Sequence, residues 1–392
     1  MAIDLFGDRD LGAVRAEHMP AARYPACLPT LAREFPAAPA VYTGALENHP
    51  EVIERFAEAR PVWGNPPEVL RRVRDPFLLR WALGRLGLPC PRCLPGDAAP
   101  PGSERWLVKP LRGAGGSGIE AYVARSNHRA RGGDRPRGDA SSTFLQEWIQ
   151  GPSGAAVFIA SQRAAHFLGA TWQIVGDPAF GAGGYRYSGS LGPLHLPRGA
   201  QDVLQRVGNL LAAEFGLLGV FGVDFVLRRG LPFLVEVNPR YTASVEILEL
   251  TLGVAALRGH AAAFAGPARD AAEACSRRAG PRRRGWLGKA ILFARKEVRV
   301  PERFPCAGPL STAPLTTAIR SAALWTVPRL ADIPRAGERI ARGRPIVTLF
   351  ASGSSAEACR FELSRNAAEV YRTLEKPARR SRRRTPSSGI GR

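Results

Sequence analysis

The 392-residue sequence contains no apolar run of 18 residues, and acidic side chains at Asp4, Asp8 and Asp10 interrupt its N-terminal segment. The first absence argues against a transmembrane helix, and the second argues against a secretory signal peptide. The six cysteines are irregularly spaced, which is untypical of a disulfide framework. Cys90 and Cys93 form a lone CxxC pair, so no zinc or redox site is expected there. We therefore expect a cytoplasmic protein that has no membrane partner.

Lysine is also scarce, because arginine supplies 51 of the 55 basic residues. The formal net charge is +21, and three arginine-rich segments, 125–137, 277–284 and 376–392, carry +16 of it. The rest of the chain is nearly balanced, and 45% hydrophobic residues overall are typical of a globular protein. A basic chain can bind nucleic acid, so that class of protein stays an alternative. It is the less favoured one, because the three segments lack interleaved aromatic side chains.

The first 75 residues alternate strand and helix patterns. Strands are predicted at 40–44 and 61–64, on either side of a helix over 47–59. This strand–helix–strand order favours a small parallel sheet. A further helix is predicted over 75–87, where Asp75 is the N-cap.

From residue 105 onward, the apolar runs predict mainly strands. The strands are expected at 105–109, 118–124, 143–149, 154–161, 165–175, 184–191, 220–227, 232–238, 288–294 and 345–350. Helices are expected at 199–215, 243–264 and 356–374. This order indicates a mixed fold of the α/β and α+β classes.

A glycine-rich loop follows the first of these strands. Lys109 and Pro110 end the strand, and four glycines lie within Gly113–Gly118. Glycines allow backbone N–H groups to approach phosphate oxygens closely. Because a strand rather than a helix follows, the loop fits neither a Walker loop nor a Rossmann turn. We expect either a structural turn or a flap suited to closing over a triphosphate.

Two strands around a turn at Gly230 carry the second motif. Their spacing places Asp224 opposite Glu236, and Asn238 shares the face of Glu236. Two carboxylates that face each other among apolar residues repel unless a cation lies between them. Carboxylate and amide oxygens suit Mg²⁺ (or Mn²⁺), which keeps phosphate oxygens in its shell. Arg240 lies one alternate position further on, where we expect it to reach a phosphate or an anionic intermediate.

Together these motifs resemble the ATP-grasp superfamily over roughly residues 75–265. The resemblance rests on Lys109-Pro110 with its glycine loop, Gln146–Ile149, Asp224 and Glu236–Arg240. It is closest to the branch of predicted ATP-dependent carboligases related to biotin carboxylase. Three further segments are similar to that branch, namely 44–50, 63–66 and 240–244.

The resemblance implies the ATP-grasp fold, in which two α+β subdomains clasp ATP. The implied domains are a Rossmann-like domain at 1–75, the ATP-grasp domain at 76–270 and a β-rich domain at 286–375. The arginine-rich composition separately predicts a flexible insert at 125–142, a linker at 271–285 and a disordered basic tail at 376–392. Residues 3–8 resemble the second strand of the Rossmann-like domain. We therefore expect that its first strand and glycine turn are missing from this sequence.

The resemblance also implies which residues bind ATP. Lys109 would contact the α- and β-phosphates. The loop residues that would cover the phosphates are Gly113, Gly115, Gly116, Ser117 and Gly118. Gln146 and Glu147 would lie where the family holds adenine and ribose. Many relatives have a second phosphate-binding lysine before the helix at 75–87, and here Arg74 or Arg80 is the candidate replacement.

The remaining implied roles concern the metal and the substrates. Asp224, Glu236 and Asn238 would bind Mg²⁺, and Arg240 would stabilise the transferred phosphoryl group. Weaker candidates for substrate contact are Arg186, Tyr241, Ser244 and Glu246.

By resemblance, the chain is expected to be an ATP-grasp ligase that forms a carbon–nitrogen bond and releases ADP. Such enzymes convert a carboxylate into an acyl phosphate, which an amine or similar nucleophile then attacks. A reaction through carboxyphosphate, as in biotin carboxylase, is the alternative that the motifs leave open. The expected partners are a small-molecule carboxylate and an amine, with a homodimer as a possible assembly.

Overall fold

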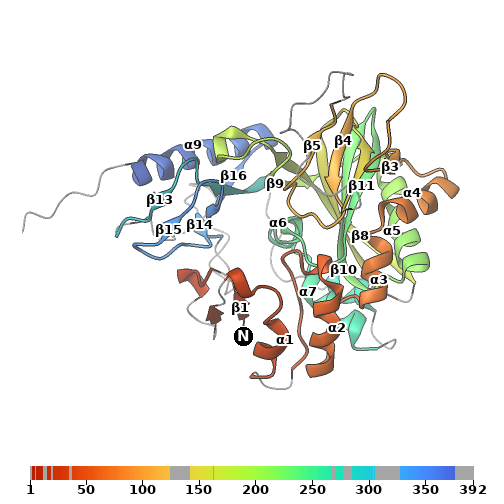
Figure 1. The fold of residues 1–392 in the computed structure, drawn as a ribbon, viewed down its shortest axis with the longest axis horizontal. Helices are drawn as coiled ribbons and strands as arrows, with labels where there is room; N and C mark the ends of the chain where they lie inside the picture. Colours follow the sequence, from red (N-terminus) through yellow and green to blue (C-terminus); the bar gives the residue numbers. More distant parts are fainter. Residues whose placement is uncertain are drawn as a thin grey trace, which may run out of the picture.

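In the computed structural model, a small N-terminal part lies beside two β-sheets, and a long helix covers the C-terminal strands (Figure 1). The structure describes residues 2–4, 6–11, 16–18, 21–34, 38–123, 142–161, 163–266, 270–276, 285–302, 304 and 327–375. The predictions for the insert (apart from Ser142), for the arginine tract at 277–284 and for the tail at 376–392 lie outside these residues.

The N-terminal part consists of short elements that pack around the buried side chains of Ile53 and Leu70. Its elements are β1 (Ala2–Asp4), β2 (Ala16–His18), α1 (Leu28–Ala32), α2 (Pro50–Ala59) and α3 (Pro67–Val73), with 3₁₀ turns at Arg9–Leu11, Ala21–Arg23 and Leu46–Asn48. β1 and β2 pair in parallel, and the helix predicted over 47–59 is confirmed as α2.

The strands predicted at 40–44 and 61–64 are wrong, because a single parallel bridge between Ala40 and Val62 replaces them. After the bridge, Ala45 has a φ of 67°, which turns the backbone into the 3₁₀ turn instead of extending a strand.

The helix predicted over 75–87 is confirmed as α4 (Pro76–Arg85). The carboxylate of Asp75 caps it by accepting hydrogen bonds from the N–H groups of Phe77 (2.8 Å) and Leu78 (3.0 Å). This cap fixes the direction of the chain where α3 meets α4, which is where the site described below begins.

Among the described residues, the smaller sheet contains four antiparallel strands, in the order β3-β6-β4-β5. Its strands are β3 (Cys93–Pro95), β4 (Trp106–Pro110), β5 (Glu120–Ala121) and β6 (Thr143–Glu147). The strand predicted at 118–124 is shortened to β5, since Gly118 has a φ of 75° and still belongs to the preceding loop.

The larger sheet has the order β11-β10-β7-β8-β9-β12-β16-β14 among the described residues, and all of its neighbouring strands are antiparallel. Its strands are β7 (Ser153–Ser161), β8 (Ala164–Val175), β9 (Tyr187–Leu194), β10 (Gly219–Arg228), β11 (Leu231–Asn238), β12 (Trp286–Phe293), β14 (Leu330–Ala331) and β16 (Pro345–Gly353). β12 pairs with β9, so the C-terminal strands continue the same sheet. β13 (Val298–Arg299) and β15 (Arg339–Ile340) form a separate pair.

Two long helices cover this sheet. α5 (Arg198–Phe215) contributes Leu204, Leu211 and Phe215 to a core shared with β7 and β10. α9 (Ala356–Glu375) contributes Cys359 and Leu363 to a second core, against β12 and β16. The sequence predicts both helices, at 199–215 and 356–374, and both are confirmed.

The single helix predicted over 243–264 is wrong. It is divided into α6 (Ala243–Leu252) and α7 (Ala256–Phe264), which are bent by 115°. Gly253 ends α6 with a φ of 71°, in the left-handed region that glycine enters without steric cost. By length and apolarity this bent pair is the one candidate for a membrane segment within the described residues, where no single helix passes that test.

α8 (Ala271–Ser276) occupies the start of the segment that was predicted to be a linker. Ala271 and Cys275 are buried against β7 and α7, so this part of 271–285 is packed helix. Alanine has a high helix propensity, so the alanine content of α8 favours a helix at this position.

Candidate active site

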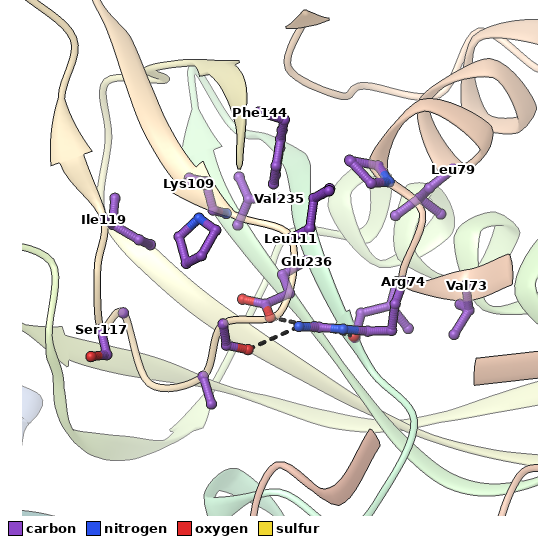
Figure 2. A pocket seen from close by; sticks show the side chains of 16 residues that line it. Val73, Arg74, Leu79, Lys109, Leu111, Ser117, Ile119, Phe144, Val235 and Glu236 are labelled. Atoms are coloured by element: carbon purple, nitrogen blue, oxygen red, sulfur yellow. Dashed lines mark hydrogen bonds and ion pairs between the residues drawn. The ribbon is translucent and has the colours of Figure 1, made fainter. Parts of the chain in front are cut away.

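A cavity of about 50 Å³ lies between the glycine loop, strand β11 and the junction of α3 and α4 (Figure 2). Its walls include the apolar side chains of Leu79, Phe144 and Val235. Charged groups reach it from both sheets, since Lys109 comes from β4 and Glu236 from β11. The site therefore combines residues that are more than 100 positions apart in the sequence.

Lys109 is buried on the inner face of the smaller sheet. Its ammonium donates a hydrogen bond to Oε1 of Gln146 (3.1 Å), and it lies 5.8 Å from the centre of the Phe144 ring. Gln146 in turn donates from Nε2 to the backbone oxygen of Val235 (3.2 Å) on β11. This chain of contacts fixes the two sheets relative to each other at Lys109.

The glycine loop lies against the start of β9. The N–H of Tyr187 donates to the oxygen of Gly115 (3.0 Å), and a Cβ added to Gly116 would lie 1.9 Å from the oxygen of Tyr185. Only glycine permits this approach, and Gly116 also has a φ of 75°. Of the predicted loop residues, the three that line the cavity are Gly113, Gly116 and Ser117, while Gly115 and Gly118 lie beside it.

The strand register pairs Asp224 with Glu236, as the hairpin spacing predicts. Asn238 donates from Nδ2 to Oδ2 of Asp224 (3.2 Å), so the three predicted metal ligands are neighbours. Gln173 on β8, which the sequence did not single out, donates to Oδ1 of Asp224 (2.9 Å). A bulge follows Asp224, after which the pairing shifts by one residue.

The two carboxylates differ in their electrostatic environment. Burial, together with the neighbouring Glu236 carboxylate, raises the pKa of Asp224 to about 7. Burial also acts to raise the pKa of Glu236, but the nearby charges of Arg74, Lys109 and Arg240 outweigh it, so the pKa of Glu236 is lowered. Glu236 is therefore the carboxylate that remains charged across the neutral range.

Arg74 provides the nearest of these charges. It follows α3 and forms an ion pair with Glu236, which Figure 2 marks with a dashed line. The same guanidinium donates to the oxygens of Val237 (3.2 Å) and Gly113 (2.9 Å) and to Oδ1 of Asn48 (3.0 Å). Arg74 thus joins the glycine loop to β11, whereas Arg80, the other predicted replacement, is exposed on α4 and does not line the cavity.

Arg240 is paired with Glu47, a residue that sequence reasoning did not select individually, although it lies in the segment 44–50. Arg240 donates from Nε to Oε1 of Glu47 (2.8 Å) and from Nη1 to the oxygen of Tyr241 (3.2 Å). The Glu47 side chain is 1% exposed, so a charged residue from the N-terminal part is buried beside Arg240. No local sequence signal distinguishes such a glutamate from a solvated one.

Three of the other predicted residues are engaged elsewhere. Glu147 accepts hydrogen bonds from Arg92, at 3.0 Å from the side-chain Nε and 3.2 Å from the backbone N–H. Arg186 donates to the oxygen of Gly343 (2.6 Å), away from the carboxylates. Tyr241 donates its hydroxyl to Oε2 of Glu249 (2.7 Å), which ties it to α6.

Ser244 and Glu246 on α6 lie over a polar strip on the larger sheet. Ser244 accepts a hydrogen bond from Thr171 on β8 (2.9 Å) and lies 3.3 Å from the hydroxyl of Ser190 on β9. Glu246 pairs with Lys289 on β12 at 2.5 Å. Ser190 is the register partner of Gln173 on β8 and of Lys289 on β12. Because Gln173 is bonded to Asp224, the polar strip extends from Asp224 through Gln173 and Ser190 to β12.

No group of three or more histidine, cysteine, aspartate or glutamate side chains able to hold a metal occurs in the described residues. The candidate donor set is instead two carboxylates and one amide, those of Asp224, Glu236 and Asn238. This set is all oxygen, which suits a hard cation better than a transition metal.

Comparison with known proteins matches residues 73–244 to the family described as the ATP-grasp domain. The large chain of carbamoyl phosphate synthase from Neisseria meningitidis is 32% identical over 77 residues, which are 20% of this chain and 7% of that protein. An uncharacterized protein of Methanocaldococcus jannaschii is 26% identical over 147 residues, which are 37% of this chain and 33% of that protein. The chain thus aligns with less than half of the length of either relative.

Solved structures extend the similarity to most of the chain. The biotin carboxylase domain of 2-oxoglutarate carboxylase from Hydrogenobacter thermophilus, solved with MgADP, ADP and bicarbonate, has a TM-score of 0.66 at 15% identity, over 94% of this chain and 84% of that chain. Biotin carboxylase from Campylobacter jejuni has a TM-score of 0.62 at 12% identity, over 96% and 89%. L-amino acid ligase from Bacillus licheniformis has a TM-score of 0.57 at 15% identity, over 91% and 86%. At these identities the similarity establishes a shared fold.

Proposed function

Because residues 73–244 match the ATP-grasp domain and the chain has the fold of biotin carboxylase domains, we propose that it is an ATP-grasp protein and an ATP- and Mg²⁺-dependent ligase. In the proposed reaction, ATP converts a carboxylate into an acyl phosphate and ADP, and an amine then attacks the acyl carbon to form an amide. The observation that carries the proposal is the facing pair Asp224–Glu236, with Asn238 beside it and Lys109 across the cavity.

The donor set fits a divalent cation. Asp224 and Glu236 are neighbouring carboxylates in a largely apolar hairpin, and burial, followed by the charge of Glu236, raises the pKa of Asp224. A cation bound by these oxygens would remove that repulsion. When bound, Mg²⁺ would supply positive charge to the phosphate oxygens of the nucleotide. Asp224, Glu236 and Asn238 would hold it.

The nucleotide would lie between the two sheets. Lys109 offers an ammonium on one wall, and the loop Gly113–Gly118 offers backbone N–H groups that can approach phosphate oxygens. Gln146 and Glu147 belong to the adjacent strand, β6. Because this cavity is about 50 Å³, far below the several hundred of a typical ligand site, we expect the loop and Arg74 to shift when the nucleotide enters.

The contribution of the protein to catalysis would be electrostatic. Arg240 follows the strand that carries Glu236 and Asn238, so its guanidinium is suited to neutralise charge on the transferred phosphoryl group. Closure of the glycine loop would exclude water, which otherwise hydrolyses an acyl phosphate. The described geometry requires no serine, cysteine or histidine nucleophile for this chemistry.

Carboxylation through carboxyphosphate is the second candidate. It is supported by the similarity to a biotin carboxylase domain that was solved with bicarbonate. Amide formation is supported by the similarity to L-amino acid ligase. A homodimer is also proposed, because the 2-oxoglutarate carboxylase domain is described as a dimer.

An assay of ADP release across a panel of carboxylates, each with amines or with bicarbonate, tests the proposal. We expect release that depends on a carboxylate and Mg²⁺, and an amide product in the presence of the correct amine. Trapping with hydroxylamine should yield a hydroxamate from the acyl phosphate. Release of AMP and pyrophosphate would contradict the mechanism, and ADP release that depends on bicarbonate alone would favour the second candidate.

A further inference from the structure

Gln173 reaches Asp224 from a strand that is not adjacent to it. In the larger sheet, β7 lies between β8, which carries Gln173, and β10, which carries Asp224. Neighbouring strands are about 4.8 Å apart, so the two backbones are separated by about 10 Å. The amide of Gln173 nevertheless donates from Nε2 to Oδ1 of Asp224 at 2.9 Å. The glutamine side chain therefore spans the intervening strand.

A small residue on β7 leaves room for this crossing. Ala155 is the register partner of Asp224 on one side and of Thr171 on the other. Register partners lie on one face of a sheet, and Gln173, two positions after Thr171, shares that face. The methyl group of Ala155 therefore lies beside the path from Gln173 to Asp224, where a longer side chain would obstruct the contact.

Both oxygens of the Asp224 carboxylate accept hydrogen bonds from side-chain amides. Oδ1 accepts from Gln173, and Oδ2 accepts from Asn238 at 3.2 Å. Two donors from different strands fix the plane of a carboxylate, whose terminal torsion is otherwise broadly distributed. Donation also stabilises the charged form of a carboxylate, which is the form that binds a cation. Because Asn238 is itself a proposed ligand, Gln173 is the partner that holds Asp224 from outside the donor set.

We propose that Gln173 is a positioning residue of the metal site, and that it holds the carboxylate of Asp224 in the orientation in which Asp224 binds Mg²⁺. The inference rests on the proposed function, because the cation is part of that proposal. Gln173 would act through Asp224 without contacting the cation. Hydrogen-bonded partners of metal ligands typically contribute about 10- to 100-fold to metal affinity, so the loss of Gln173 should be measurable.

Binding of a fluorescent ADP analogue to the full chain tests this role without any substrate. Gln173→Met keeps the length of the side chain but removes the amide. In excess Mg²⁺, we expect the Kd of the analogue to rise at least about 10-fold in this variant. In EDTA, where no cation reaches Asp224, the Kd should change by less than about 3-fold. A residue that only supported the fold would affect both Kd values alike.

Gln205→Met is the matched control. Gln205 is a half-buried glutamine that joins α5 to β8, since it donates to the oxygen of Ala165 (2.6 Å) and accepts from the N–H of Phe167 (3.2 Å). Its replacement should lower the melting temperature but leave the Kd of the analogue unchanged, both in Mg²⁺ and in EDTA.

Gln173→Asn is the second variant, and it decides the question if Gln173→Met does not fold. It retains the amide but is one methylene shorter, so the amide should no longer span β7 to Asp224. We expect it to raise the Kd in Mg²⁺, but not in EDTA, as Gln173→Met does.

The possible failures are distinguishable. Wild-type Kd values in Mg²⁺ for both Gln173 variants would overturn the role of Gln173 while the proposed function stands. Equal increases in Mg²⁺ and in EDTA would also overturn it, since Gln173 would then support the nucleotide site as a whole. If the wild type binds the analogue equally well with and without Mg²⁺, the proposed metal site fails, and the role of Gln173 fails with it.

Discussion

Arg74 and Glu236 form an ion pair across the candidate active site, between the end of α3 and strand β11. The side chains are 13% and 28% exposed, so the pair is largely removed from water. Arg74 also holds the glycine loop through the oxygen of Gly113. One side chain thus neutralises a proposed metal ligand and fastens the loop that would cover the nucleotide.

Removing Arg74 should destabilise the ligand-free protein. Arg74→Ala leaves the Glu236 carboxylate without its nearest positive charge, which we expect to lower the free energy of unfolding by about 2 kcal/mol. Because a bound cation would replace that charge, saturating MgADP should recover much of the loss. Urea unfolding with and without MgADP measures both quantities. Arg71→Ala, an exposed neighbour on α3, should change stability by less than about 0.5 kcal/mol. If Arg74→Ala lowers the free energy of unfolding by the same amount with and without MgADP, a bound cation does not replace the charge of Arg74.

Glu236→Gln should nearly abolish turnover while the fold remains. The amide keeps the shape of the side chain but removes the charge that a divalent cation needs, and we expect kcat to fall at least about 100-fold. Circular dichroism should be unchanged, and Glu297→Gln in the exposed turn after β12 should retain full activity. Turnover close to the wild-type value would refute the metal assignment.

Asp224→Asn should stabilise the metal-free protein, and more so at high pH. The folded-state pKa of Asp224 is raised to about 7, above that of an unfolded aspartate, so the folded protein binds this proton more tightly. The stability of the wild type therefore falls as the pH rises through 7, by about 1 kcal/mol between pH 6 and pH 8. Asp224→Asn has no carboxyl group to titrate at this position. In a buffer that contains a chelator, its free energy of unfolding should therefore exceed that of the wild type by an amount that grows from pH 6 to pH 8. An advantage independent of pH would show that Asp224 is charged throughout.

Lys109→Met should weaken nucleotide binding more than it weakens the fold. The substitution preserves the apolar stem beside Phe144 but removes the ammonium that would meet the phosphates, and we expect the KM for ATP to rise about 10- to 100-fold. Lys296→Met provides a control, since Lys296 is an exposed lysine outside the site. Titration with a fluorescent ATP analogue measures the effect directly, and equal affinities for the two variants would exclude Lys109 from the phosphate site.

Gly116→Ala should prevent the loop from closing against β9. Its Cβ would meet the oxygen of Tyr185 at 1.9 Å, whereas a Cβ on Gly115 would meet nothing within 4 Å. Both glycines have positive φ, at 75° and 59°, so Gly115→Ala carries similar backbone strain without the clash. We expect Gly116→Ala to release more ADP per amide formed than the wild type does, because ATP hydrolysis is no longer coupled to ligation. Gly115→Ala should keep the wild-type ratio. Equal coupling in both would show that the loop does not exclude water.

Much of the local structure could be predicted from the sequence. The pairing of Asp224 with Glu236 follows from strand periodicity around a turn, and the cap at Asp75 follows from the chemistry of one side chain. The division of α6 from α7 could not be predicted in this way, because Gly253 is tolerated within a helix as well as at its end. Whether it ends the helix depends on what the following turn packs against.

The candidate site shows the same division between what the sequence determines and what the packing determines. Its sequence determined which residues carry the chemistry of β4, β10 and β11, since a strand places its alternate side chains on one face without reference to the rest of the chain. Only the tertiary structure decided the ion partners: Arg74 meets Glu236 across 162 positions, and Arg240 meets Glu47 across 193. Such contacts depend on how whole elements pack, and no local pattern records them. The scarcity of lysine therefore did not help to identify the cations of the site. Two of them, Arg74 and Arg240, are arginines, and the sequence contains 51 arginines.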